Sequence, residues 1–463
     1  MKAADPLQTI RKFFLVFLFL AFTIDNPFSG AFGGYQAFTG IPANLLFATI
    51  SALTGIPIPF SIYEWTIFGI AFLIFKKQKS LGEFPSGVVQ ALALYWGYVL
   101  FWAMISAYII KTDTQAIFWD FKGLITAPFL MFIFARLFPQ PQDWVIPFKV
   151  FAGAILFKCS QALFLNAFVW EAKHRVIKGY LIDHAASYQI STVLLVILGS
   201  MIFRSWRPQN LRTTFAVVTV ILILLAAFVL NQRRTEMAGF AMSLILMGGI
   251  IGSRRPIATI VALPFLGIFV TLYVAAFANS TSILGKPIQM LNSLNDAKNL
   301  SNLYRKIENY NLFSSLSDNP FFGQGFGTPM HDVAGLSAFL DGNFFLLHPH
   351  NSILGLWMQA GIVGFCFFML MFSIFSFYAL RNIFRKSSPL ALTMGAVALS
   401  NLFRYLVFSE GDQLFLHSSS NFVLGATLGA IVVVAQSTQN QTCSGSAAQK
   451  NNKFSGNKTF AVR

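Results

Sequence analysis

Residues 348–380 read HPHNSILGLWMQAGIVGFCFFMLMFSIFSFYAL, a polar tetrapeptide that leads directly into a long apolar run. A helix needs about 20 apolar residues to cross the hydrocarbon core of a bilayer, and this run exceeds that length. The whole chain of 463 residues has the same character, with 56% hydrophobic and 11% charged residues. Soluble domains carry about 25% charged residues. We therefore predict an all-α integral membrane protein.

Similar apolar runs recur along the chain. They lie at 13–24, within 41–75, and at 88–110, 123–138, 145–169, 186–203, 213–230, 237–252, 256–278, 352–380, 389–408 and 414–435. The stretch Gly55-Ile56-Pro57-Ile58-Pro59 interrupts 41–75, so this region is expected to hold one span and a partial or re-entrant piece. The pattern predicts about twelve transmembrane helices.

Lysine and arginine residues cluster in some of the polar segments between these runs. The clusters lie at 76–79, 204–212, 254–255 and 381–386, and both ends of the chain are also basic. Because cytoplasmic loops of membrane proteins are enriched in Lys and Arg, the pattern predicts that both termini are cytoplasmic. The net charge of +16 is then mainly an orientation signal, and we expect no nucleic-acid partner.

This topology divides the chain into a polytopic membrane domain, 1–435, and a tail, 436–463. The tail is rich in Ser, Gln, Asn and Lys, which predicts a disordered cytoplasmic segment. Residues 279–351 form one large loop on the outer side. Within this loop, 289–318 carry apolar residues at helical spacing, so we predict an amphipathic helix lying on the outer membrane surface.

The tetrapeptide His348-Pro349-His350-Asn351 ends this loop. Pro349 keeps His348 extended, and Asn351 is a suitable N-cap for the helix that follows. The exposed N–H groups of that helix and the neighbouring histidines then make an anion site with a titratable base. Taken alone, the four residues fit ordinary loop capping equally well. No third ligand has suitable spacing for zinc, so we expect no metal.

Arginine residues supply a second set of candidates. Arg233-Arg234 lies outside in a short turn, against the general charge trend. Such a pair at a membrane edge suits a phosphate or diphosphate. The alternative is an interfacial pair that snorkels to the surface and is neutralised by Glu236. Arg305 lies on the predicted surface helix, where its spacing alone favours a solvated helix face.

Glycines and intramembrane cations complete the candidates. Gly323, Gly325 and Gly327 alternate before the histidines, and they either let the backbone approach a ligand or act as a simple hinge. Lys158 and Arg404 lie in predicted spans, where a cation is a functional candidate. Arg404, near the outer end of its helix, is expected to join the site. For Lys158, pairing with a carboxylate such as Glu64 is equally compatible with the sequence.

Together these features resemble the O-antigen ligase and O-antigen polymerase superfamily, which are integral-membrane glycosyltransferases of bacterial surface polysaccharide synthesis. The resemblance is strongest over about 160–375, and its final motif is the most specific part. The matching residues are Arg234-Thr235, Arg305 before the stretch 319–327, and then His348, His350, Asn351, Leu354, Gly361 and Gly364. Gln359 departs from the pattern, because the family often has an acidic residue there.

The resemblance implies an enzyme of the bacterial inner membrane whose site faces the periplasm. The implied donor is a glycan on a polyprenyl (undecaprenyl) diphosphate, and the acceptor is lipid A-core or a growing polysaccharide. Arg234 and Arg305, with Arg233, would hold the diphosphate, while His350 would orient or deprotonate the acceptor hydroxyl. His348 and Asn351 would position the acceptor. Arg404, Gly323 and Gly325 remain substrate-binding candidates from the residues alone. Neither a cofactor nor a metal is implied.

Several functions stay open at this point. A ligase and a polymerase share these motifs, and a protein O-oligosaccharyltransferase of the same superfamily is a further alternative. A transporter or flippase for lipid-linked glycans is an alternative of another class. It would depend on intramembrane cations, and on Lys158 more than on His350.

Overall fold

The computed structural model describes residues 6–24, 42–43, 45–55, 58, 60–77, 84–170, 181–280, 282, 284–293, 300–338, 344–385, 388–415 and 417–455. Within these ranges the chain is helical and no strand is formed, which confirms the predicted all-α class. The longest helices are α1 (Pro6–Ile24), α4 (Ile62–Lys77), α5 (Ser86–Ile105), α6 (Thr114–Leu137), α7 (Val145–Phe164), α8 (His184–Ile202), α9 (Leu211–Leu230), α10 (Arg234–Arg254), α11 (Pro256–Phe277), α13 (Leu300–Asp318), α15 (Ser352–Phe384), α16 (Pro389–Ser409) and α17 (Ser418–Ser455).

Ten helices in the described ranges are long and apolar enough to cross a membrane. Every predicted apolar run contains a helix. Of the two runs whose helices are not among these ten, one holds α4 with 16 residues and the other α11 with 22 residues. Region 41–75 contains α4 and the short helix α3 (Ile50–Thr54), which ends at Gly55. The structure therefore shows a multi-pass membrane protein, while the count of about twelve and the side of each terminus stay predictions.

The centre of the bundle is formed by α6, α8, α16 and α17. The apolar windows of these helices are 67–83% buried, against 17% for α9. The pair α6 and α17 packs most extensively, and glycines on both helices allow this approach. A Cβ at Gly425 would collide with Leu130, and one at Gly123 would collide with the carbonyl of Phe415. Small residues at helix contacts are the usual means of close packing within a membrane.

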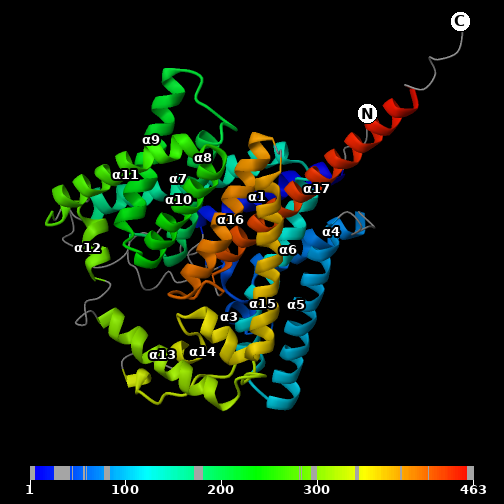
Figure 1. Cartoon of the computed structure of the whole chain (residues 1–463). Coiled ribbons are helices and arrows are strands. Elements are labelled where there is room, and N and C mark those ends of the chain that lie inside the picture. Colours follow the sequence, from blue (N-terminus) through cyan, green and yellow to red (C-terminus); the bar gives the residue numbers. More distant parts are fainter. Residues whose placement is uncertain are drawn as a thin grey trace, which may run out of the picture.

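The C-terminal helix enters the segment that we predicted as a disordered tail from residue 436. The structure describes α17 as one helix to Ser455, and a separate disordered tail stays a prediction. Figure 1 shows this end of α17 projecting away from the bundle, at the end opposite to α13 and the short helix α14 (Phe344–Leu347). Helical structure is compatible with the polar composition because a helix already started in the apolar part needs no new nucleation step.

The predicted surface helix is present in part, as α12 (Lys286–Asn292) and α13. Part of its apolar surface packs within the protein, and its contact with the membrane surface stays a prediction. The apolar face of α13, including Leu312, joins a small core with Met330, Leu336 and Met358. Because these partners belong to the loop and to α15, α13 is a folded cover over one end of the bundle (Figure 1).

A break in α15 positions the loop against the bundle. Gly361 has φ 67° and ψ 178°, a backbone conformation that is essentially restricted to glycine. In a continuous helix the N–H of Ile362 would donate to the carbonyl of Met358. Here it donates to the carbonyl of Pro320 at 2.9 Å. The break therefore opens the helix to hydrogen bonds from another segment.

The glycine-rich stretch 319–327 and two side chains of α5 satisfy the carbonyl groups that the break releases. The N–H groups of Gln324 and Gly325 donate to the carbonyls of Met358 and Gln359, at 2.8 and 2.9 Å. Trp102 Nε1 donates to the carbonyl of Gln359 at 2.8 Å, and the Tyr98 hydroxyl donates to that of Ala360 at 2.6 Å. Such compensation is required wherever a helix is broken inside a membrane.

Replacing Gly361 with alanine should destabilise the protein by about 1–3 kcal/mol or more, because alanine is strained in this backbone conformation. Its Cβ would also collide with the carbonyl of Phe321. The measurement is thermal unfolding of the detergent-purified protein. Gly153→Ala is the matched control, since a Cβ there meets nothing within 4 Å. Equal unfolding temperatures for the two variants would contradict this account of the break.

Candidate active site

A carboxylate on α13 holds His350. Glu308 is 1% exposed, and its Oε1 accepts a hydrogen bond from the backbone N–H of His350 at 2.8 Å. The same oxygen lies 3.1 Å from Nδ1 of the His350 ring, whose side chain is 19% exposed. An ionised carboxylate can only accept hydrogen bonds, so Nδ1 carries the proton. The pair thus orients the ring and makes Nε2 the nitrogen for base chemistry.

Tyr304, one turn before Glu308 on α13, packs edge-on against the His350 ring at 5.3 Å between centroids. Burial raises the pKa of the Tyr304 hydroxyl, and the negative charge of Glu308 raises it further. The phenol is therefore neutral across the physiological pH range. Tyr304 acts as a wall beside the histidine and adds no charge to the site.

His348 lies on the bundle side of the loop and is buried. Its Nδ1 lies 2.9 Å from Asp120 Oδ1 on α6. Its carbonyl accepts a hydrogen bond from the side chain of Gln413. Asp120 was not among the predicted residues, although an acidic residue beside an apolar run was a signal that could have identified it. The two histidines of the motif are therefore oriented by two different carboxylates.

Asn351 is the predicted N-cap of the following helix, and the structure confirms this. Its Oδ1 accepts a hydrogen bond from the N–H of Leu354 at 3.0 Å. Its Nδ2 lies 3.4 Å from Asn309 Oδ1 on α13. Asn351 therefore ties the start of α15 to α13, and its predicted role in substrate binding stays a proposal.

The turn after α16, residues 410–413, contacts two of the predicted arginines and one of the predicted histidines. Arg305 Nη2 donates to the carbonyl of Gly411 at 2.9 Å, and Arg233 Nη1 lies 3.9 Å from Asp412 Oδ2. The Gln413 side chain reaches His348, as described above. The sequence analysis did not identify this segment as part of a site. Its role depends on contacts across 65 residues or more, which no local pattern reports.

Arg234 stands apart from this turn. Its Nη1 donates to the carbonyl of Ser293 at 3.0 Å, just after α12. Its neighbour Thr235 does approach the turn, since a Cβ at Gly411 would lie 2.6 Å from Thr235 Cγ2. The structure thus brings Arg233 and Arg305 to one segment and holds Arg234 beside α12.

The glycines serve backbone packing in the structure. Gly323 has φ 77° and lies against α15. Gly325 has φ 97° and lies against the π-helical turn η2 (Ser106–Ile110). A Cβ at Gly323 would collide with the backbone of Gly361, and one at Gly325 would lie 2.5 Å from Ile110 Cδ1. We predicted substrate binding for both. The structure shows a packing role for both, because only a bare backbone can approach so closely, and their part in substrate binding stays a proposal.

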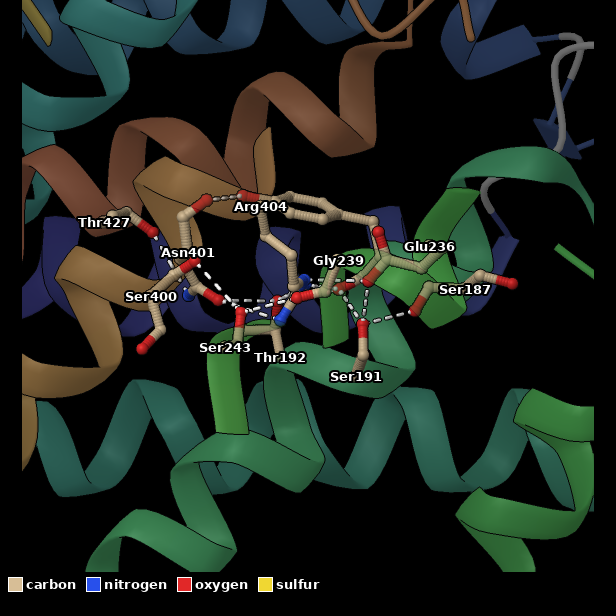
Figure 2. Close-up of polar contacts among 11 residues, drawn as sticks. Ser187, Ser191, Thr192, Glu236, Gly239, Ser243, Ser400, Asn401, Arg404 and Thr427 are labelled. Atoms are coloured by element: carbon tan, nitrogen blue, oxygen red, sulfur yellow. Dashed lines mark hydrogen bonds and ion pairs between the residues drawn. The ribbon is translucent and has the colours of Figure 1, made fainter. Parts of the chain in front are cut away.

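Arg404, a predicted substrate-binding residue, is held by other groups within the bundle. It is fully buried, and its Nε lies 2.8 Å from Glu236 Oε1 (Figure 2). Its Nη2 donates to the Tyr188 carbonyl and to Thr192 Oγ1, and its Nη1 donates to Asn401 Oδ1. These bonds join α8, α10 and α16. These bonds give Arg404 a structural role, and its predicted role in substrate binding stays a proposal.

Glu236 was also assigned differently. We considered it as a partner that neutralises Arg233-Arg234, but the structure pairs it with Arg404. Its Oε1 also accepts a hydrogen bond from Ser191 on α8 (Figure 2). Lys158 likewise has a carboxylate partner, Asp183 at 3.5 Å, whereas Glu64 lies 4.0 Å from Lys122. The predicted kind of pairing is thus present, but with other partners.

The described residues contain no group of three or more His, Cys, Asp or Glu side chains that could hold a metal ion. A small pocket lies between α6 and α15 beside His348. Its polar lining consists of Asp120, His348, Ser352 and Gln359. The remaining lining is apolar and includes Leu124 and Phe415. The pocket therefore reaches the buried histidine from the bundle side.

Comparison with known families supports the class that this geometry indicates. Residues 219–369 match the family model described as O-antigen ligase. The matched segment runs from α9 to α15 and includes Arg233, Arg305, Glu308 and both histidines. The match confirms the predicted resemblance to the O-antigen ligase superfamily of membrane glycosyltransferases. No curated protein matches the chain.

The structural role assigned to Arg404 predicts a specific pattern of stabilities. Arg404→Leu leaves Glu236 buried without its partner and should cost about 3–5 kcal/mol. Adding Glu236→Leu should recover much of that loss, since no charge is then buried. Arg11→Leu removes a part-exposed pair with Asp143 and should cost about 0–1 kcal/mol. Thermal unfolding in detergent measures all three. A double variant as unstable as Arg404→Leu would argue against the ion pair.

Proposed function

We propose that the protein transfers a glycan from a polyprenyl diphosphate carrier to an acceptor hydroxyl at the periplasmic face of the inner membrane. The observation that carries this proposal is the Glu308–His350 pair, with Arg305 one turn away on the same helix. Residues three apart on a helix face the same side, about 5–6 Å apart at Cβ. A single rigid helix thus carries a base-orienting carboxylate and a candidate diphosphate ligand.

The chemistry follows from these groups. His350 Nε2 accepts the proton of the acceptor hydroxyl. At the same time the hydroxyl oxygen forms a bond to the anomeric carbon of the donor. The bond between that carbon and the diphosphate oxygen breaks, and its electron pair leaves with the diphosphate. Arg305, with Arg233 and Arg234, neutralises the charge that develops there. Glu308 stabilises the imidazolium while it holds the proton, in the way that a buried carboxylate supports a catalytic histidine.

The alternative of another class loses part of its support. A transporter or flippase would use Lys158 as an intramembrane anion ligand, but Lys158 lies 3.5 Å from Asp183 and both are buried. Between a ligase to lipid A-core, a polymerase and a protein O-oligosaccharyltransferase, we favour the first two. No separate acceptor-binding domain was recognised in the sequence that would favour the third.

His350→Ala should reduce transfer by about 10²- to 10⁴-fold, the usual contribution of a general base. His331→Ala is the control, because His331 lies in the same loop but its side chain is 49% exposed and pairs with Asp318. Both would be tested in a deletion strain by gel analysis of lipopolysaccharide and lipid-linked glycans. If the strain without activity accumulates long glycan on the carrier and has bare lipid A-core, the protein is a ligase. If that strain has lipid A-core capped by single repeat units, the protein is a polymerase. Normal glycans in the His350→Ala strain would refute the catalytic histidine.

Arg305→Ala should raise the donor KM above that of the wild type. Arg305→Lys should recover only part of the lost activity, because lysine keeps the positive charge but lacks the forked pair of hydrogen-bond donors of arginine. The control is Lys306→Ala, which removes an exposed cation from the neighbouring position of α13. Steady-state kinetics with a purified lipid-linked donor provide the measurement. Unchanged donor KM in Arg305→Ala would remove this residue from the diphosphate site.

A further inference from the structure

Asp120 on α6 joins three segments that are far apart in the chain. Its Oδ1 lies 2.9 Å from His348 Nδ1. Its Oδ2 accepts hydrogen bonds from the N–H of Gly327 at 2.6 Å and from Gln359 Nε2 at 2.7 Å. These donors belong to the histidine motif, the glycine-rich stretch and the break in α15. One buried carboxylate thus connects the parts that build the candidate site.

The hydrogen-bond donors around Asp120 require an acceptor at this position. Both oxygens of Asp120 are used, and its side chain is 4% exposed. Without it, Gly327 N–H and Gln359 would lose an acceptor in a buried place, which costs about 1–3 kcal/mol for each group. A carboxylate at Nδ1 also keeps the proton on that nitrogen and fixes the orientation of the ring. Gln359, at the position where the resemblance led us to look for an acid, acts as a neutral donor to Asp120.

The position of His348 controls the position of His350. A single residue, Pro349, separates them, and proline restricts the backbone of the intervening segment. Pro349 also packs closely on α15, since a Cβ at Gly355 would lie 2.9 Å from Pro349 Cγ. The connection between the two histidines is therefore stiff. Anchoring His348 to α6 helps to set where His350 meets Glu308.

We propose that Asp120 is a positioning residue, the carboxylate within the helix bundle that holds His348 and thereby places the His350 base against the acceptor. This inference rests on the proposed function. Asp120 does not contact the reacting groups itself. Its effect should therefore fall on kcat and leave the donor KM nearly unchanged, because the arginines depend on the turn 410–413 and on α12. Misplacement of a reacting group by about 1 Å can cost about 100-fold in rate.

The test moves the negative charge between two neighbouring residues. Asp120→Asn should lower kcat by about 100-fold. The double variant Asp120→Asn with Gln359→Glu returns a carboxylate to the cluster, with the new amide donating to it, and should regain part of the lost kcat. Asp113→Asn is the control, because Asp113 is an exposed acid that caps the same helix. Thermal unfolding in detergent is recorded for each variant.

A second readout is independent of glycan transfer. The full-length protein is treated with diethyl pyrocarbonate, and modification of His348 and His331 is followed by mass spectrometry. His348 should be protected in the wild type, exposed in Asp120→Asn and protected again in the double variant, while the exposed His331 reacts equally in all of them. Equal protection of His348 in the wild type and Asp120→Asn would overturn the proposal.

The kinetic outcomes separate this proposal from the proposed function. Wild-type kcat in a folded Asp120→Asn variant, or a folded double variant no more active than the single one, would overturn the positioning role. A loss of activity explained entirely by a lower folded fraction would also overturn it. Normal glycans in the His350→Ala strain would refute the proposed function instead, and the modification of His348 would still decide whether Asp120 holds the histidine.

Discussion

The break at Gly361 in α15 is the constraint on which the rest of the site depends. A helix interrupted within a bilayer leaves N–H and carbonyl groups that lipid cannot satisfy. Here the backbone of 319–327 and two aromatic side chains of α5 supply the missing bonds. The loop is therefore held to the bundle by obligatory hydrogen bonds, and α13 is carried with it. This attachment explains why a polar loop can present candidate catalytic groups with defined geometry.

Charged groups inside the bundle have different structural roles, which follow from the residues that they contact. Arg404 and Glu236 neutralise one another and connect α8, α10 and α16 (Figure 2). Asp120 instead faces the loop and accepts hydrogen bonds from it. Buried charges persist only where such partners compensate their desolvation. The first pair thus supports the scaffold, and the second group connects the scaffold to the candidate site.

Much of the fold was predictable because apolar runs and basic clusters are local signals. Each predicted run contains a helix, and Asn351 caps α15 as expected. The candidate site was predictable only in part. Glu308 on α13 contacts His350, and Arg305 lies three residues earlier on that helix. Arg404 pairs with Glu236, and Gly323 and Gly325 pack closely against neighbouring segments. Glu308, Asp120 and the turn 410–413 were missed as site elements, because their partners lie 42 to 239 residues away in the chain.

By itself the sequence determined the membrane class, the helices and the histidine motif. These features follow from composition, periodicity and spacing, which are local signals that extend over no more than one helix. Only the tertiary structure decided which carboxylate faces which histidine, and which cation is structural. Those assignments follow from burial and from hydrogen bonds between distant segments. A buried charge must find an acceptor or counter-ion wherever the fold provides one, so its partner cannot be read from its neighbours in the chain.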